Sequence, residues 1–371
     1  MVDRVSFVGL KQNYLKYGDE TLAAIKRCLE NGDFIMRDDV DEFEESVANL
    51  HGRKHAIGLN SGTDALFLSL KAAGVGPGDE VITVGHTFVA SISAIVHCGA
   101  TPVLVDVGVN HVMDVDQAIS KINSKTKAII PVHLNGRLVE MKPLMAAAEE
   151  ANIFIVEDAA QAWLATIDGQ MAGTFGLTGC FSLYPMKTLG SIGDGGVVVT
   201  DDDEVASVIR SLRDHGQVRG PDQIDLGFFG YNSRLDNIGA AVLNTRLPHL
   251  REWVELRGTL ADLYNKRLCE ISHITLPLYE TRSERTYDSY QNFVIQTPHR
   301  DKLKAHLAER GVETLISWPV PNHLQTGLGL DHFSLPVTES ISSTVISLPM
   351  YAELTVDEVE FVCESVATFS S

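Results

Sequence analysis

The sequence predicts an α/β protein in which a large domain with a mostly parallel β-sheet is followed by a smaller C-terminal α+β domain. The chain has 371 residues, more than a single hydrophobic core usually organises. Strand-like and helix-like segments alternate along the first 160 residues, as in parallel sheets covered by helices on both faces. The strand-like segments are continuous apolar runs, which is typical of strands buried on both sides.

The expected elements of the first domain follow one another closely. Glycines such as Gly74 and Gly99 stand where helices are expected to end. The predicted helices span residues 19–31, 38–51, 63–73, 87–97, 115–121, 141–151, 201–214 and 235–247. The predicted strands span residues 55–59, 80–84, 102–106, 128–133, 153–157, 180–184 and 196–200.

A long helix predicted over residues 250–271 leads into the second domain. We therefore expect the large domain to cover residues 1–250 and the small domain residues 251–371, with the boundary within 245–260. The predicted elements of the small domain are strands at 290–297 and 312–316 and helices at 301–310 and 355–368.

The composition excludes several classes of protein. Acidic residues outnumber basic ones by 49 to 30, and a net charge of −19 disfavours binding to nucleic acid or an anionic membrane. No apolar run approaches the roughly 20 residues of a membrane span, and the first residues lack the apolar core of a signal peptide. The five cysteines form no C-x-x-C pair and no H-E-x-x-H occurs, so no metal site or disulfide framework is predicted. A cytoplasmic location is expected.

Residues 181–196, FSLYPMKTLGSIGDGG, place Lys187 alone among uncharged side chains, ahead of a glycine-rich turn. In an apolar pocket a lysine loses its proton more readily, because desolvation disfavours the ammonium. The neutral amine can form a Schiff base with an aldehyde or ketone. Taken alone, the segment also fits a solvated surface lysine on a turn.

Residues 60–66, NSGTDAL, follow a strand and open a helix. The backbone N–H groups at Gly62 and Thr63 would lie at the positive end of the helix dipole, which suits a phosphate. Simple N-capping by Asn60 or Ser61 is the alternative. The segment is not a P-loop, and without a G-x-G-x-x-G motif a nicotinamide site is not expected.

Asp158 comes directly after an apolar strand, where ligands bind in open α/β sheets. A buried carboxylate there needs a cationic partner, and a pyridinium N–H would be one. Gln161, on the following turn, could reach a ring hydroxyl, and Phe88 could stack on a planar ring. A helix N-cap and a core phenylalanine are the respective alternatives.

Residues 230–236, GYNSRLD, precede a helix and offer Asn232 and Arg234 to an anion, although a cap with a salt bridge would explain them equally. Taken jointly, the motifs supply a phosphate cradle, a ring-stacking side chain, a carboxylate for a ring nitrogen and an imine-forming lysine. Pyridoxal 5′-phosphate (PLP) needs each of these groups.

In these motifs the chain resembles the DegT/DnrJ/EryC1/StrS family, the PLP-dependent nucleotide-sugar aminotransferases. The resemblance covers almost the whole chain and implies the aspartate-aminotransferase fold, PLP fold type I. It extends to FIMRDDVDEFE (34–44), GPGDEVITVGHTFVA (76–90), KAIIPVHLNG (127–136), VEDAAQA (156–162) and ISLPMY (346–351).

The resemblance implies a role for each candidate residue. Lys187 would form the imine and move the proton, and Asp158 would pair with the pyridine nitrogen. Gln161 would contact the ring hydroxyl, and Phe88 would stack on the ring. The phosphate would be held by Gly62, Thr63 and Ser182, and by Asn232 of the neighbouring subunit.

The resemblance also implies the partners of the site. A shared site implies a homodimer. The implied substrate is a nucleotide-linked keto-sugar, with L-glutamate as the expected amino donor. The product would be an amino-deoxy sugar for a surface polysaccharide or a glycosylated metabolite.

Tyr184, Trp318 and His323 are expected near the substrate. Ser317 and Trp318 stand where family members often carry histidine and tyrosine, so the sugar, its nucleotide and the aminated carbon stay open. Two alternatives within the fold are a PLP-dependent sugar dehydratase, which carries histidine at the lysine position, and a non-catalytic regulatory homologue. A cysteine desulfurase is disfavoured, because none of the five cysteines lies in a recognisable active loop.

Overall fold

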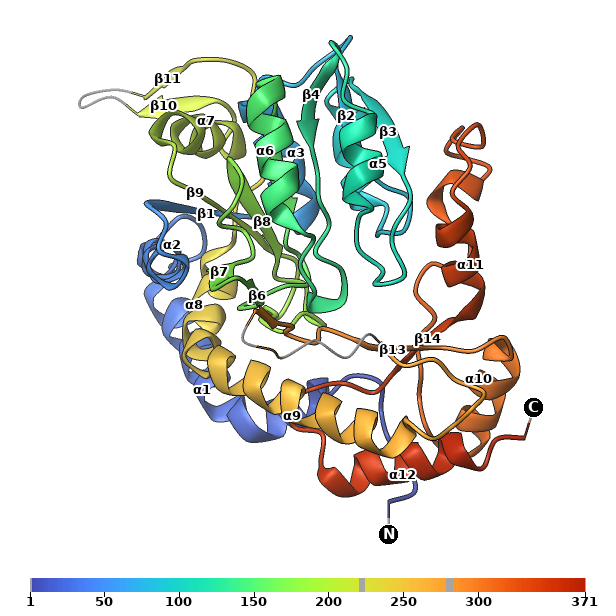
Figure 1. Cartoon of the computed structure of the whole chain (residues 1–371). Helices are drawn as coiled ribbons and strands as arrows, with labels where there is room; N and C mark the ends of the chain where they lie inside the picture. Colours follow the sequence, from blue (N-terminus) through green and yellow to red (C-terminus); the bar gives the residue numbers. More distant parts are fainter. Residues whose placement is uncertain (1, 220–223, 278–282, 284, 371) are drawn as a thin grey trace.

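The computed structural model describes residues 2–219, 224–277, 283 and 285–370. Its main feature is a seven-stranded sheet with the strand order β1-β9-β8-β5-β4-β2-β3 (Figure 1). Only β9 runs antiparallel to its neighbours, so the predicted mostly parallel sheet is confirmed. The strands are β1 (His55–Leu59), β2 (Glu80–Val84), β3 (Thr101–Val105), β4 (Thr126–Ile129), β5 (Phe154–Asp158), β8 (Thr178–Ser182) and β9 (Gly196–Thr200).

Helices pack around this sheet in groups. The helix α3 packs against α4 and α7, whereas α8 packs against α1 and α2 (Figure 1). Buried aliphatic side chains of the strands and of α3 form the main core, as the apolar runs predict. The helices of this part are α1 (Leu10–Asn31), α2 (Asp38–His51), α3 (Gly62–Ala72), α4 (Ala90–His97), α5 (Val115–Ser120), α6 (Met141–Ala151), α7 (Asp203–Arg213) and α8 (Asn237–Arg246).

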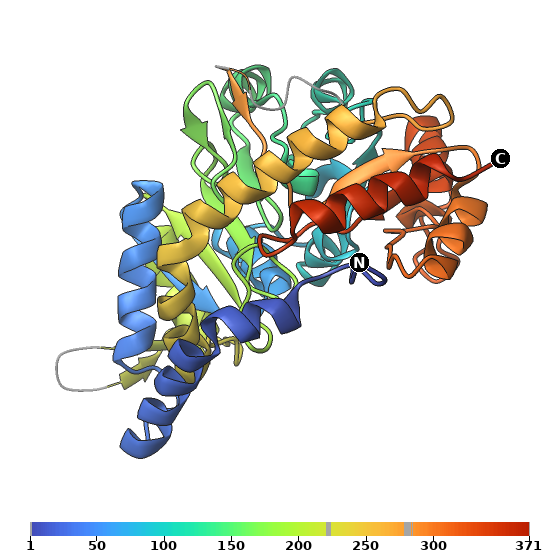
Figure 2. The same ribbon diagram turned by 90° about the horizontal axis from the view of Figure 1, so that it is seen from below.

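A second core lies beyond α8, around the long helix α9 (Leu250–Leu268). There α9 packs against α12 (Val356–Ala367), and the strands β13 (Phe293–Gln296) and β14 (Val345–Leu348) pair antiparallel (Figure 2). The core joins Tyr264, Phe293 and Leu348. The remaining elements of the C-terminal part are β12 (Thr286–Tyr287), α10 (Arg300–Glu309), η3 (Asn322–Leu324) and α11 (Pro336–Thr344).

Two segments cross the boundary predicted near residue 250, and the division itself stays a prediction. Val5 lies in the second core and bridges Val312. Thr338 of α11 donates from its backbone N–H and its hydroxyl to Asp106, which follows β3 in the sheet.

The structure departs from the expected elements at several places. The strand predicted at 312–316 is wrong, because that segment makes only isolated bridges at Val312 and Leu315. The helix predicted from residue 87 begins at Ala90, which leaves Phe88 on a loop. Short pairs that the sequence did not predict are β6 (Thr166–Ile167) with β7 (Gln170–Met171), β6 with β12, and β10 (Gln217–Arg219) with β11 (Ile224–Leu226). Within the described ranges, no helix combines the length and apolarity that a bilayer crossing requires.

Candidate active site

The candidate site lies at the carboxyl edge of the sheet, where β1, β2, β5 and β8 all end. A cavity of about 680 Å³ is lined by residues that follow these strand ends. Ligands of open α/β sheets bind at this edge. Of the predicted site residues, the structure brings nine to this cavity: Gly62, Thr63, Phe88, Asp158, Gln161, Ser182, Tyr184, Lys187 and Trp318.

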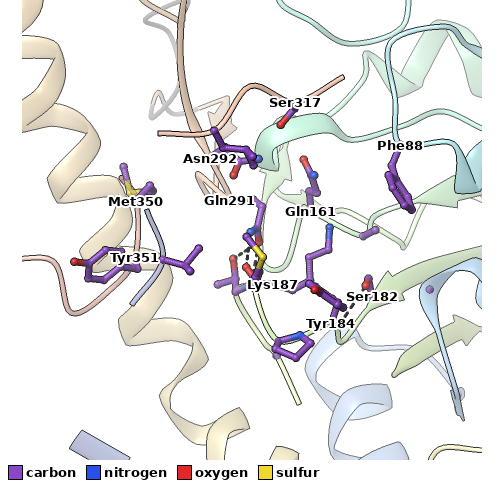
Figure 3. A pocket seen from close by; sticks show the side chains of 18 of the residues that line it. Phe88, Gln161, Ser182, Tyr184, Lys187, Gln291, Asn292, Ser317, Met350 and Tyr351 are labelled. Atoms are coloured by element: carbon purple, nitrogen blue, oxygen red, sulfur yellow. Dashed lines mark hydrogen bonds between the residues drawn. The ribbon is translucent and has the colours of Figure 1, made fainter. Parts of the chain in front are cut away.

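Lys187 lies on a tight turn that follows β8. Its backbone N–H donates to the Tyr184 carbonyl at 2.8 Å, and Ser191 N–H donates to the Leu183 carbonyl at 2.7 Å. Figure 3 shows the amine extending into the open space between Gln161 and Ser182. Burial lowers the pKa of Lys187 to about 8, and the negative charge of Asp158 opposes that shift. An amine with this pKa is partly unprotonated at neutral pH.

Asp158 ends β5 and is almost fully buried. The Ser91 hydroxyl donates to its Oδ2 at 2.7 Å, and Ala160 N–H donates to its Oδ1 at 3.2 Å. Ser91 also bonds the Thr87 hydroxyl at 2.8 Å. Burial raises the pKa of Asp158, while the bond from Ser91 opposes the rise. Such a carboxylate can accept a hydrogen bond from a cationic ring N–H in the cavity.

The first turn of α3 packs directly against β8 and β9. Ser61 is the N-cap and accepts from Asp64 N–H at 3.1 Å, so the capping alternative is correct for this residue. A Cβ at Gly62 would lie 2.8 Å from the Cβ of Ser182, and one at Gly196 would lie 2.2 Å from the Ser61 carbonyl oxygen. Glycine is therefore required at both positions, and the first-turn N–H groups border the cavity beside Ser182.

Phe88 and Gln161 are each held by a polar contact from a distant segment. The ring of Phe88 is 59% exposed and faces the cavity (Figure 3). Its loop is tied by Asn322, whose Nδ2 donates to the Gly85 and Thr87 carbonyls at 3.2 and 2.7 Å. The Oε1 of Gln161 accepts from Asn135 N–H at 2.8 Å, which fixes the orientation of that amide.

The structure does not bring two predicted residues to the cavity. His323 is fully buried, and its Nε2 lies 3.1 Å from Oε1 of Glu339 in α11. Its ring contacts α11 and is not among the groups that line the cavity, so the expected substrate contact stays a prediction. Asn232 is exposed outside the cavity, where its backbone bridges Asp214. Its expected role requires a second subunit.

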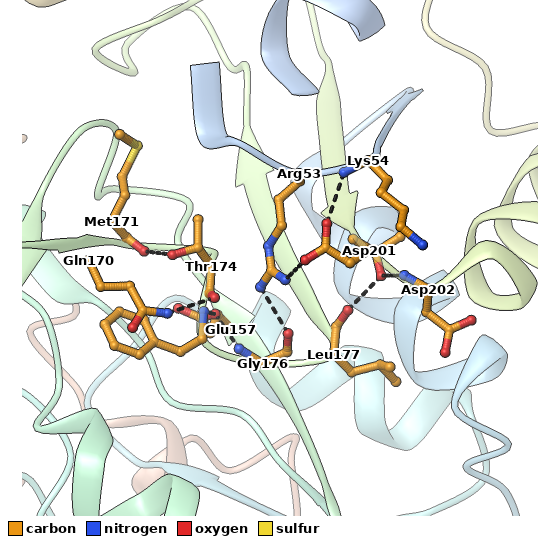
Figure 4. Close-up of polar contacts among 12 residues, drawn as sticks. Arg53, Lys54, Glu157, Gln170, Met171, Thr174, Gly176, Leu177, Asp201 and Asp202 are labelled. Atoms are coloured by element: carbon orange, nitrogen blue, oxygen red, sulfur yellow. Dashed lines mark hydrogen bonds and ion pairs between the residues drawn. The ribbon is translucent and has the colours of Figure 1, made fainter. Parts of the chain in front are cut away.

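Three polar residues in or behind the cavity wall were not predicted. Ser91 and Gln291 have no sequence pattern that marks them. Glu157 is fully buried and accepts from the N–H groups of Gly173, Phe175 and Gly176 at 2.8, 2.7 and 2.7 Å. Figure 4 shows Glu157 beside Gly176. Its Oε2 also lies 2.9 Å from His133 Nε2. Two consecutive acids at the end of an apolar strand were the pattern that could have indicated it.

The fold, and a cavity with a buried lysine at the carboxyl edge of the sheet, are typical of an aminotransferase. The chain belongs to the DegT/DnrJ/EryC1/StrS aminotransferase family, whose sequence pattern matches residues 16–367. Within the described residues, no three His, Cys, Asp or Glu side chains are grouped to hold a metal ion.

Curated relatives resemble the chain over nearly its full length. A dTDP-3-amino-3,4,6-trideoxy-α-D-glucose transaminase of Streptomyces venezuelae is 40% identical, covering 94% of this chain and 91% of the relative. A UDP-2-acetamido-2-deoxy-3-oxo-D-glucuronate aminotransferase of Pseudomonas aeruginosa is 35% identical, covering 98% and 99%. A pleiotropic regulatory protein of Geobacillus stearothermophilus is 37% identical, covering 98% of each.

Solved structures also resemble the chain over nearly its full length. DesV of S. venezuelae, crystallised in complex with a ketimine intermediate, has a TM-score of 0.93 at 39% identity and covers 99% of this chain and 98% of that one. A family aminotransferase from Brucella abortus has a TM-score of 0.91 at 35% identity, covering 98% of each.

Proposed function

We propose that the protein uses PLP to move an amino group from L-glutamate to a nucleotide-linked keto-sugar. The observation that carries this proposal is the partly unprotonated Lys187 amine near the buried Asp158 carboxylate, in one cavity with the α3 N-terminus. Relatives named as transaminases of dTDP-linked and UDP-linked sugars support it. A cytoplasmic location fits five cysteines that form no disulfide.

The residues present fit PLP. The missing Cβ of Gly62 lets Ser182 pack against the first turn of α3, so the Ser182 hydroxyl lies beside the N–H groups that would hold a phosphate. The exposed ring of Phe88 offers a flat surface for stacking. Asp158 would accept from the ring N–H, and the fixed amide of Gln161 would meet the ring hydroxyl.

Each of these side chains would have a separate role in the reaction. When bound, PLP supplies the electron-withdrawing ring that stabilises negative charge on the substrate carbon. The negative charge of Asp158, held in place by Ser91 and Ala160, would keep the ring nitrogen protonated. Lys187 serves as the general base that moves the proton, since a pKa of about 8 lies close to working pH. Tyr184 and Trp318 border the cavity where the sugar would lie.

We also propose a homodimer in which Asn232 completes the phosphate site of the neighbouring subunit. Leu15, Leu22 and Leu29 recur every seventh residue of α1 and are 72%, 51% and 56% exposed. A seven-residue spacing puts them on one stripe of the helix, which lies at the edge of the molecule (Figure 2). Exposed apolar stripes of this kind mark protein interfaces.

Two other functions within the family are disfavoured. A sugar dehydratase would carry histidine where this chain has Lys187. A regulatory role is favoured by the name of the Geobacillus relative, yet a non-catalytic protein would not need the desolvated Lys187 and the buried Asp158 in one cavity.

Replacing Lys187 with alanine tests the proposal. The variant should lose the visible absorbance of bound PLP and all turnover, whereas Lys302→Met, on the exposed face of α10, should keep both. A panel of nucleotide keto-sugars, assayed with L-glutamate by mass spectrometry, would identify the sugar and the donor. Turnover by Lys187→Ala at the rate of the unaltered protein would contradict the assignment.

A further inference from the structure

Gln291 contacts the residues on both sides of Lys187, although it lies in the C-terminal part of the chain just before β13. Its Oε1 accepts from the backbone N–H and the hydroxyl of Thr188, at 2.9 and 3.0 Å. Its Nε2 donates to the Met186 carbonyl at 2.9 Å. Figure 3 shows this amide beside the base of the lysine.

The two peptide groups that Gln291 binds are the ones attached to the Lys187 Cα. The Met186 carbonyl belongs to the peptide bond before Lys187, and Thr188 N–H belongs to the one after it. Holding both peptide planes fixes φ and ψ of Lys187, and these angles set the direction in which its side chain leaves the backbone. The amide thus acts on the orientation of the amine through the main chain.

Gln291 is itself held from two directions and is 7% exposed. Its backbone N–H donates to the carbonyl of Asn135 at 3.0 Å, and the N–H of the same Asn135 donates to Gln161. Its carbonyl accepts from Nη1 of Arg257 at 3.3 Å, and Arg257 also donates to the Tyr290 carbonyl at 3.1 Å. Gln291 therefore connects α9 to the lysine turn.

An amide is the side chain that this position requires. It accepts and donates at once, so it can bind an N–H on one side of Lys187 and a carbonyl on the other. Glutamate would keep the acceptor but lose the donor, and leucine would lose both. Burying an amide without hydrogen-bond partners would lower the stability of the fold, so packing alone does not explain this side chain.

We propose that Gln291 is a positioning residue that sets the direction of the Lys187 side chain and so determines how fast Lys187 captures PLP. The inference rests on the proposed function, in which Lys187 is the group that captures the cofactor. Gln291 acts on Lys187 through the main chain, because its side chain is bonded to the backbone at residues 186 and 188.

The test uses cofactor-free full-length protein mixed with PLP, and measures the rate of covalent capture at Lys187 per folded molecule. Reduction with borohydride and peptide mass spectrometry identify the lysine. Gln291→Leu should slow capture by about tenfold or more, since small misplacements of a reacting group cost up to roughly a hundredfold. Gln291→Glu should capture PLP at a rate between that of Gln291→Leu and that of the unaltered protein.

Two controls separate positioning from a general structural effect. Gln296→Leu, in β13, removes an amide that bonds His111 and Thr344, and it should leave capture unchanged. 4′-Deoxypyridoxine 5′-phosphate, which lacks the aldehyde, should bind the Gln291 variants as tightly as it binds the unaltered protein. A folding defect would weaken both binding and capture.

The outcomes distinguish this inference from the proposed function. If the unaltered protein does not capture PLP at Lys187, the proposed function fails. If it does, and both Gln291 variants capture PLP at the same rate, the positioning role is overturned. Should Gln291→Leu not fold, Gln291→Glu decides the question, with its folded fraction measured by circular dichroism.

Discussion

Burial and the negative charge of Asp158 have opposite effects on the pKa of the Lys187 amine. Burial removes water from the ammonium and lowers its pKa from the ordinary 10.5 to about 8, against the attraction of Asp158. The protein therefore loses stability in order to keep this amine reactive. The loss is about 1.4 kcal/mol for each pKa unit, so about 3 kcal/mol at most, and water in the cavity reduces it.

Because burial of the Lys187 ammonium lowers the stability of the protein, replacing this lysine should raise it. Between about pH 8 and 10.5 the unfolded chain holds a proton on Lys187 that the folded protein has released, so this residue's contribution to stability rises with pH. Lys187→Met should therefore stabilise the cofactor-free protein at pH 7, by up to about 3 kcal/mol. The gain should vanish near pH 10.5. Urea unfolding of both proteins at each pH measures it, and an equal gain at both pH values would contradict the argument.

The hydroxyl of Ser91 makes a second prediction at this scale. Ser91→Ala removes a hydrogen bond to the buried Asp158 carboxylate and should raise the pKa of Asp158 further. Hydrogen bonds to charged groups contribute about 1.5–3 kcal/mol, so the affinity for PLP should fall by roughly tenfold or more, as measured by fluorescence titration. Ser93→Ala is the matched control, because its hydroxyl donates only to carbonyls of its own helix, at Val89 and Ala90.

The sequence was sufficient for those site residues that belong to a set of motifs. Lys187 and Asp158 could be placed in one cavity because their segments occur together with NSGTDAL, whereas each segment alone also fits a simpler explanation. Gln291 could not, since its partners at residues 186 and 188 are more than a hundred positions away in the chain. The contact of His323 with Glu339 could not be predicted, because Glu339 lies on α11, a helix that no sequence pattern indicated.

Among the elements, the end of β5 carries two carboxylates that serve different purposes. Successive residues of a strand face opposite sides, so Glu157 binds the backbone of residues 173–176 while Asp158 faces the cavity. Three backbone N–H donors and His133 satisfy Glu157 completely. The contacts of Glu157 therefore fix the position of Asp158 from the far side of the sheet.

Removing the Glu157 carboxylate should be severely destabilising. Glu157→Ala would leave four hydrogen-bonding groups without this partner, two in buried and two in partly buried bonds, and losing one side of a buried charged network costs about 3–5 kcal/mol. Denaturant unfolding measures the loss. Glu150→Ala, exposed near the end of α6, should change stability by less than about 0.5 kcal/mol. A similar small change in Glu157→Ala would show that the network contributes little.

Most elements were predictable, and those that were not depend on long-range pairing. Strands β1 and β2 have the predicted bounds, since their apolar runs are bounded by turns. The segment 312–316 has a strand-like composition but meets partners only at Val312 and Leu315. Pairing of this kind depends on the N-terminal Val5 and on β14, which no local pattern reveals.

At the scale of the whole molecule, the proposed shared site can be tested by combining two inactive variants in one dimer. In a dimer of Lys187→Ala with Asn232→Ala, one site would carry both changes and the other neither, if Asn232 serves the neighbouring subunit. Each variant alone should be inactive. Random mixing after refolding should restore about one quarter of the activity, because half of the dimers would be mixed and each would hold one intact site. No recovery would place Asn232 in the site of its own subunit.

The loop at residues 173–176 has a consequence for anyone redesigning this protein. It lies next to the short strands β6 and β7, away from the cavity, and would pass for a surface connection suited to an inserted tag or a new epitope. Yet its backbone supplies three of the donors to Glu157. An insertion there would disturb the acid next to Asp158 without touching any residue of the cavity, and it should lower stability in the same way as loss of the Glu157 carboxylate.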